Sequence, residues 1–151
     1  MRNRTVAALS VTLWCAVVAP RHSLSQVVSP ARTASVTVTV DAKLPWVDSG
    51  LMVRKGERVS FDAGGTIQWG AKPGQVAGPE GHDAKAGKLG KGGLIGRVGY
   101  NGKPFPIGNA RTPIVMPKSG ELFLGINDFI FGDNAGVFAV TISPPGAPSR
   151  Q

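Results

Sequence analysis

Residues 120–142, GELFLGINDFIFGDNAGVFAVTI, decide the fold that the sequence predicts. Within this stretch, residues 122–126 (LFLGI) are apolar at every second position and carry Phe or Gly between, which is typical of a strand largely buried on both faces. Residues 137–142 (VFAVTI) predict a second strand. The segment that joins the two strands is rich in Asn, Asp and Gly, so it is expected to form a loop at one end of the sheet structure.

This loop carries four short side chains with oxygen ligands: Asn127, Asp128, Asp133 and Asn134. A hard cation such as Ca²⁺ takes roughly six to eight oxygens from carboxylates, amides and backbone carbonyls, so the loop could supply about half of them. The same residues are also the ordinary chemistry of tight turns, because Asx side chains bond to their own backbone. The spacing is not that of an EF-hand. A cation site and a plain turn are therefore the two interpretations.

Residues 1–25 have the composition of a secretory signal peptide. Arg2 and Arg4 form a basic start, and residues 6–19 are apolar but too short to span a bilayer comfortably. Small residues up to Ser25 suit a cleavage site. We therefore predict a secreted or periplasmic protein that has no membrane span after cleavage near Ser25.

The cysteine content and the distribution of charge argue against a disulfide-stabilised fold and against a protein that binds nucleic acid. Cleavage would remove Cys15, so the mature chain would use no disulfide. It would also lower the formal charge from +8 to +5, because three arginines precede the cleavage site. The densest basic group is Lys85, Lys88 and Lys91. No aromatic stacking platform is interleaved with the basic residues, which argues against a nucleic-acid partner.

The remaining chain predicts one all-β domain, residues 34–142, between a mobile leader at 26–33 and a disordered tail at 143–151. Short strands are expected at 34–40, 51–54, 58–62, 66–69, 94–98, 105–107, 114–116, 122–126 and 137–142. Lys55-Gly56-Glu57 is typical of a hairpin turn, and residues 71–92 of a long surface loop. Gly and Pro turns between many short strands favour an antiparallel β-sandwich, jelly-roll-like, of about eight to ten strands.

The sequence contains little evidence for a catalytic site. His82 is the only histidine after residue 25, and the sequence has no Gly-x-Ser-x-Gly nucleophile motif. A hydrolase would need a second carboxylate facing Asp128 or Glu80 across a groove, and the spacing of the acidic residues selects no such pair. We therefore expect a protein that is not an enzyme. Trp46 and Trp69 are either sugar-stacking platforms or core residues.

Taken together, these features resemble the PA-I galactophilic lectin family, which comprises secreted bacterial β-sandwich lectins that bind galactosides through Ca²⁺. The resemblance extends over roughly residues 36–142, and its last block is the most specific. The landmarks, in order, are Pro45–Gly50, Gly56, Trp69–Gly70, Gly78–Gly81, Gly93–Gly99, Phe105–Gly108, Ser119–Leu124, Asn127–Asp128 and Asp133–Phe138.

The resemblance implies a Ca²⁺ site with specific ligands. Side-chain ligands would be Asp128, Asp133 and Asn134, and backbone carbonyls would come from Trp69 and from a residue near Ile130. Sugar hydroxyls would coordinate the same ion and donate hydrogen bonds to Asp128 and Asp133. The loop between these two residues is shorter than in the familiar lectins, and Asp133 stands where they carry Asn.

The sugar-contacting loop of the family corresponds to the segment after Gly81. A gapless comparison places Lys85 at the family's histidine position, with His82 nearby and no Gln after it. The resemblance implies a calcium-dependent domain for galactose-like or other diol-bearing sugars, with Ca²⁺ as cofactor and a glycan as partner. Oligomerisation would add avidity. The alternative is a structural or interaction β-sandwich that keeps the lectin fold without binding sugar.

Overall fold

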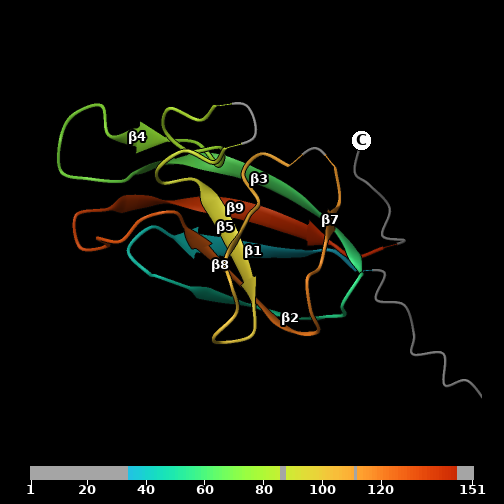
Figure 1. Ribbon diagram of the computed structural model, residues 1–151. Coiled ribbons are helices and arrows are strands. Elements are labelled where there is room, and N and C mark those ends of the chain that lie inside the picture. The colour runs from blue at the N-terminus through green and yellow to red at the C-terminus, as the bar shows by residue number, and fades with distance from the viewer. Residues whose placement is uncertain (1–33, 86–87, 111, 146–151) are drawn as a thin grey trace, which may run out of the picture.

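Two antiparallel β-sheets face each other and enclose one apolar core (Figure 1). The structure is a computed structural model that describes residues 34–85, 88–110 and 112–145. The expected signal peptide and leader lie outside the described residues, as does the tail from residue 146 onward. In the described part of the chain, no helix is long and apolar enough to cross a bilayer.

The strands divide between the sheets as follows. The first sheet contains, in order, β1 (Val36–Asp41), β9 (Ala135–Ser143), β3 (Arg58–Gln68) and β4 (Val76–Ala77), with β7 (Ile114–Val115) paired to β3. The second contains, in order, β2 (Val47–Val53), β8 (Gly120–Ile126), β5 (Leu94–Val98) and β6 (Phe105–Pro106). The expected all-β antiparallel sandwich is thereby confirmed.

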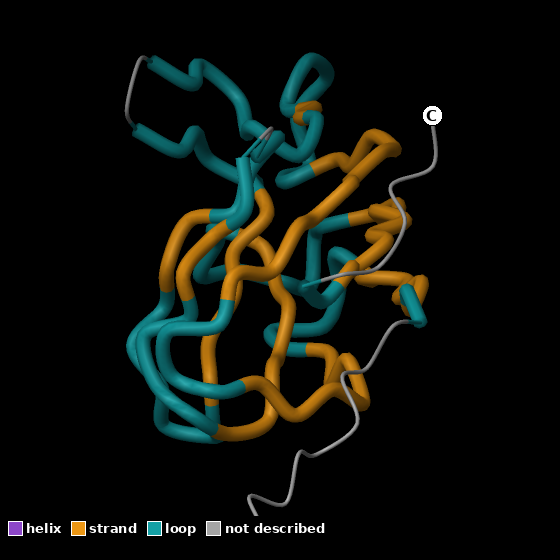
Figure 2. Tube along the Cα trace, turned by 90° about the vertical axis from the view of Figure 1, so that its right-hand side faces the viewer, coloured by secondary structure: helices purple, strands orange, loops and turns teal. Residues whose placement is uncertain are grey.

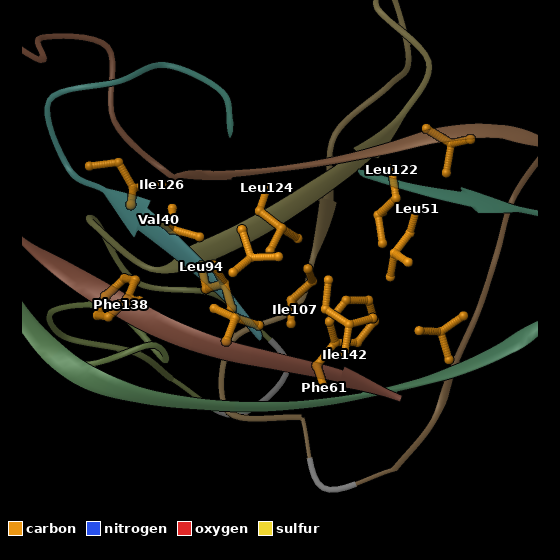
Figure 3. Close-up of a cluster of buried hydrophobic side chains, with 14 of the residues drawn as sticks. Val40, Leu51, Phe61, Leu94, Ile107, Leu122, Leu124, Ile126, Phe138 and Ile142 are labelled. Atoms are coloured by element: carbon orange, nitrogen blue, oxygen red, sulfur yellow. The ribbon is translucent and has the colours of Figure 1, made fainter. Parts of the chain in front are cut away.

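The core lies between the two sheets and is built from alternate positions of their strands (Figure 3). Leu122, Leu124 and Ile126 of β8 point into it, and they meet Phe138 and Ile142 of β9. Fully burying one such side chain contributes about 1.5–3 kcal/mol. Residues 120–142 therefore supply both a strand of the second sheet and a central strand of the first.

Three predictions about the strands were wrong: β4 (Val76–Ala77) lies within the segment expected to be a surface loop, where its pairing with β3 forms a short strand, and two expected strand boundaries differ. Residues 58–62 and 66–69 belong largely to one strand, β3, because its ladder with β9 runs without a break from Ser60–Ser143 to Gln68–Ala135. The glycines at 64 and 65 are held within that ladder by the long partner strand. Likewise β2 begins at Val47, and the turn-like composition before Leu51 forms a β-bulge, with Gly50 at φ 67°.

The expected hairpin at residues 55–57 was also wrong. Glu57 N donates to Arg54 O at 3.0 Å, so a tight turn is present. However, β2 pairs with β8 whereas β3 pairs with β9, so this turn crosses from one sheet to the other. The loop from β8 to β9 crosses between the sheets at the opposite end of β8. Figure 2 shows the loops, including the one that carries β4, projecting beyond the strands.

Candidate functional site

Three segments that are distant in sequence meet at one end of the sandwich. Gln68 pairs with Ala135, so Trp69, which follows β3, comes next to Asn134, which precedes β9. On the other side, Gly92 N donates to Asn127 O at 2.9 Å, and Asn127 N donates to Gly93 O at 2.7 Å. The end of β3, the segment before β5 and the β8–β9 loop therefore form one surface.

Asp128 lies buried at the centre of this surface. Its side chain is 2% exposed, and its Oδ1 accepts a hydrogen bond from Phe129 N at 2.8 Å. Its Oδ2 has no hydrogen-bond partner among the described residues. A carboxylate oxygen that is buried without a partner costs free energy, because it has lost water and gained nothing in exchange.

Asn134 presents a second buried acceptor of the same kind. The residue is 2% exposed, and its Nδ2 donates to Ala42 O at 3.1 Å. The orientation of the amide follows from this bond, since only the nitrogen can donate to a carbonyl. The amide Oδ1 therefore points away from Ala42, and within the described chain nothing bonds to it. Asp128 and Asn134 thus contribute two unsatisfied oxygens from one loop.

Lys91 places a positive charge at this surface. Its Nζ lies 3.9 Å from Asp128 Oδ1 and 4.4 Å from the centroid of the Trp69 ring. The backbone can come this close because residue 92 is glycine: at its φ of 72°, a Cβ would lie 3.0 Å from Trp69 Cβ. The sequence shows that Lys91 belongs to a basic group but carries no signal that it lies beside Asp128. Only the pairing of Gly92 and Gly93 with Asn127 brings it there.

The other predicted metal ligands lie at the same end with greater exposure. Asp133 is exposed in the turn before Asn134, and Ile130 is 66% exposed at the tip of the loop. The neighbouring carbonyl, Phe131 O, accepts from Asn134 N at 3.3 Å and closes the turn. The structure therefore brings the five metal candidates to one end and buries only Asp128 and Asn134.

The two predicted sugar contacts in the loop before β5, His82 and Lys85, lie at different distances from Trp69. His82 packs its ring against Trp69, with centroids 5.4 Å apart, and its backbone N donates to Lys91 O at 2.8 Å. Its Nε2 lies 3.3 Å from Asp83 Oδ2. Lys85 is exposed and forms a backbone bridge with Lys88. His82 thus belongs to the surface around Trp69, and Lys85 stands further out on the loop.

An apolar groove of about 640 Å³ adjoins Asp128. Phe105, Phe129, Phe131 and Trp46 line part of it. Trp46 packs over Gly125 of β8, where a Cβ would lie 3.1 Å from the indole, and the Arg97 guanidinium lies 4.3 Å from its ring centroid. Trp46 therefore covers the outer face of the second sheet instead of filling the core between the sheets.

Comparison with known proteins identifies the family of the chain. No family model matches it. Lectin A of Photorhabdus laumondii subsp. laumondii is 30% identical over 99 residues, which span 62% of this chain and 78% of that protein. The chain belongs to the Lectin A family of bacterial lectins.

A solved structure agrees with this assignment. The N-terminal domain of EclA, described as a PllA-like lectin, superposes with a TM-score of 0.63 and 27% identity, covering 72% of this chain and 95% of that chain. The lectin relationship that the sequence predicted is thus confirmed for this Lectin A family member. The galactose preference that the resemblance implied stays a prediction.

Proposed function

We propose that this Lectin A family member is a calcium-dependent carbohydrate-binding domain that takes a galactose-like or other diol-bearing sugar. The observation that carries the proposal is the pair of buried, unpartnered oxygens, Asp128 Oδ2 and Asn134 Oδ1, in one loop. The ammonium of Lys91 lies 3.9 Å from the Asp128 carboxylate, which supports the view that this loop attracts a cation.

The chemistry of the donor set suits Ca²⁺. Carboxylates of Asp128 and Asp133 would balance the double charge, and Asn134 would add a neutral amide oxygen. The described residues contain no group of three His, Cys, Asp or Glu side chains that could hold a metal, so the cation would also depend on carbonyl oxygens, such as those of Trp69 and Ile130. A cation that engages the two unpartnered oxygens would remove a penalty of about 1–3 kcal/mol for each of them.

Sugar recognition would follow from the same atoms and would involve no bond making or breaking. Oxygens of two neighbouring sugar hydroxyls would coordinate the bound cation, while the same hydroxyls would donate hydrogen bonds to the carboxylates of Asp128 and Asp133. His82 and Trp69 flank this position and would contact the sugar ring from one side. The domain is accordingly proposed to be a binding protein and not an enzyme.

Calorimetric titration of Ca²⁺ into chelator-treated protein tests the cation site. We expect heat of binding and a raised melting temperature in the wild type, because a ligand that binds only the native state stabilises it. Asp128→Asn should abolish both effects. Asp62→Asn is the matched control, since Asp62 is an exposed residue of β3, and it should bind Ca²⁺ as the wild type does. Absence of binding at millimolar Ca²⁺ would contradict the calcium dependence.

A second titration tests the sugar. Galactose and other hexoses with neighbouring hydroxyls are added to the protein with Ca²⁺ and, separately, with a chelator. Binding that requires Ca²⁺ supports the proposal. If Ca²⁺ binds and no glycan does, the domain keeps the lectin fold for a structural or interaction role, which is the alternative function.

Export is part of the proposal. The signal-like residues 1–25 support cleavage near Ser25 and a secreted or periplasmic location. Intact mass of the protein recovered from the periplasm and the medium tests this, since cleavage after Ser25 leaves a chain that begins at Gln26. Recovery of uncleaved protein in the cytoplasm alone would refute it.

A further inference from the structure

Lys91 is the feature of the site that the proposed function does not use. Its side chain is 52% exposed, and its ammonium lies between the Asp128 carboxylate and the face of Trp69. The peptide unit that follows the Lys91 side chain is held by two hydrogen bonds, because His82 N donates to Lys91 O at 2.8 Å and Gly92 N donates to Asn127 O at 2.9 Å. The lysine therefore cannot leave the site entirely, and only its flexible side chain can move.

The charges at the site leave an imbalance once a divalent cation is bound. Asp128 and Asp133 together carry two negative charges, which match Ca²⁺. Lys91 then adds one positive charge that no group of the cation site offsets. A neutral sugar leaves this charge unpaired, whereas a sugar with one negative charge would neutralise it. Charge complementarity of this kind governs which ligand of a set is preferred.

The charged groups around Lys91 favour the same class of ligand. Lys88 is exposed and lines the groove that adjoins Asp128. Of the acidic residues in this loop, Asp83 has its Oδ2 3.3 Å from His82 Nε2, and Glu80 is exposed beside Gly78. Neither carboxylate is paired with Lys91 in the described structure. A ligand that reaches from the cation site toward Lys91 therefore meets one ammonium group, and Lys88 adds a second positive residue at the adjoining groove.

We propose that the site is specific for an acidic sugar, namely a glycan unit that combines two neighbouring hydroxyls with a carboxylate or sulfate group bound by Lys91. The inference rests on the proposed function, because the hydroxyls need the cation. Beyond that function, it specifies which class of sugar the site binds. When Ca²⁺ binds, the Lys91 ammonium moves away from Asp128. It can then bind the anionic group of the ligand.

The test compares four ligands in the presence of Ca²⁺ and at low salt: galactose, methyl galacturonate, galacturonic acid and galactose 6-sulfate. Calorimetry on the full chain should show the two anionic ligands binding up to about fivefold more tightly than the two neutral ones. The two anionic ligands show which group supplies the negative charge. A preference for galacturonic acid alone indicates a carboxylate, and a preference for the sulfate ester alone indicates a sulfate.

Variants of the lysine show whether the preference comes from Lys91. Lys91→Gln should lose the preference for anionic ligands while it keeps its fold by circular dichroism and still binds Ca²⁺. Lys91→Arg keeps the charge and should retain a preference. Lys55→Gln is the matched control, because Lys55 is exposed in the turn between β2 and β3, at the end of the sandwich away from the site.

The outcomes separate this inference from the function on which it rests. If the neutral sugars bind as tightly as the acidic ones, or if Lys91→Gln keeps the anionic preference, the inference is overturned and the calcium-dependent lectin stands. If none of the four ligands binds although Ca²⁺ does, the proposed sugar binding fails and the acidic specificity fails with it.

Discussion

Replacing Lys91 by glutamine should tighten Ca²⁺ binding in the absence of any sugar. The ammonium lies 3.9 Å from Asp128 Oδ1, which is the buried carboxylate proposed to hold the cation. A divalent cation held by Oδ2 of the same carboxylate competes with this ammonium for its negative charge and is repelled by it. Glutamine is polar, slightly shorter and uncharged, so the substitution removes the competing charge together with the cation–π contact on Trp69.

The magnitude follows from the geometry. Two unit charges about 4 Å apart attract by about 1 kcal/mol in water and about 4 kcal/mol at an effective dielectric constant near 20. The lysine side chain is 52% exposed, so the lower figure applies, and measured exposed pairs contribute about 0.2–1 kcal/mol. Once displaced, the tethered ammonium still repels the cation, which adds a few tenths of a kcal/mol at a Debye length of about 8 Å. The sum is about 0.5–1.4 kcal/mol, or a gain of roughly two- to tenfold in affinity.

Calorimetric titration of Ca²⁺ into chelator-treated wild type, Lys91→Gln and Lys55→Gln measures this difference. The control should match the wild type, because Lys55 lies at the other end of the sandwich. The gain of the Lys91 variant should shrink as salt is raised, since an exposed charge is screened. Unchanged Ca²⁺ affinity in Lys91→Gln would refute the competition, and weaker affinity would show that the lysine supports the cation site.

Two further predictions concern the core and the tryptophan beside the lysine. Phe138→Ala should lower the free energy of unfolding by about 3–5 kcal/mol in a denaturant titration, because Phe138 is fully buried, whereas Val137→Ala, 44% exposed on the same strand, should change it by less than about 0.5 kcal/mol. Ca²⁺ should change the intrinsic fluorescence by moving the ammonium that lies 4.4 Å from the Trp69 ring, so Trp69→Phe should remove the change and Trp46→Phe should preserve it.

The sequence predicted the fold where local pattern and burial agree. Residues 122–126 form most of β8, with Leu122, Leu124 and Ile126 buried in the core, and the strand expected at 94–98 has those bounds in the structure. The errors arose where a long-range partner overrides local composition. Gly64 and Gly65 look like a break, yet the ladder with β9 carries β3 through them. The turn at residues 54–57 is real, but sequence proximity could not show that its strands lie in different sheets.

The candidate site was predictable in part for the same reason. Asp128 and Asn134 flank strands whose apolar pattern is clear, so their place in one loop could be predicted from the sequence. Trp69 lies next to Asn134 because the register of β3 and β9 pairs Gln68 with Ala135. No local sequence signal encodes this register. The position of Lys91 depends on two backbone hydrogen bonds that join the segment before β5 to Asn127. Its charge was visible in the sequence, but its position beside a carboxylate was not.

The lysine also couples the two ligands that the site is proposed to take. An acidic sugar that binds the ammonium draws it away from Asp128 and so removes the competitor of the cation. Coupling between two binding sites is reciprocal: the factor by which Ca²⁺ strengthens the sugar must equal the factor by which the sugar strengthens Ca²⁺. Galacturonic acid should therefore raise Ca²⁺ affinity more than galactose does. Lys91→Gln should reduce this excess even though it binds Ca²⁺ alone more tightly, because the variant has no competitor left to remove. Equal coupling in the wild type and in Lys91→Gln would mean that the lysine and the cation act independently, and the acidic sugar would then have to be recognised by another group.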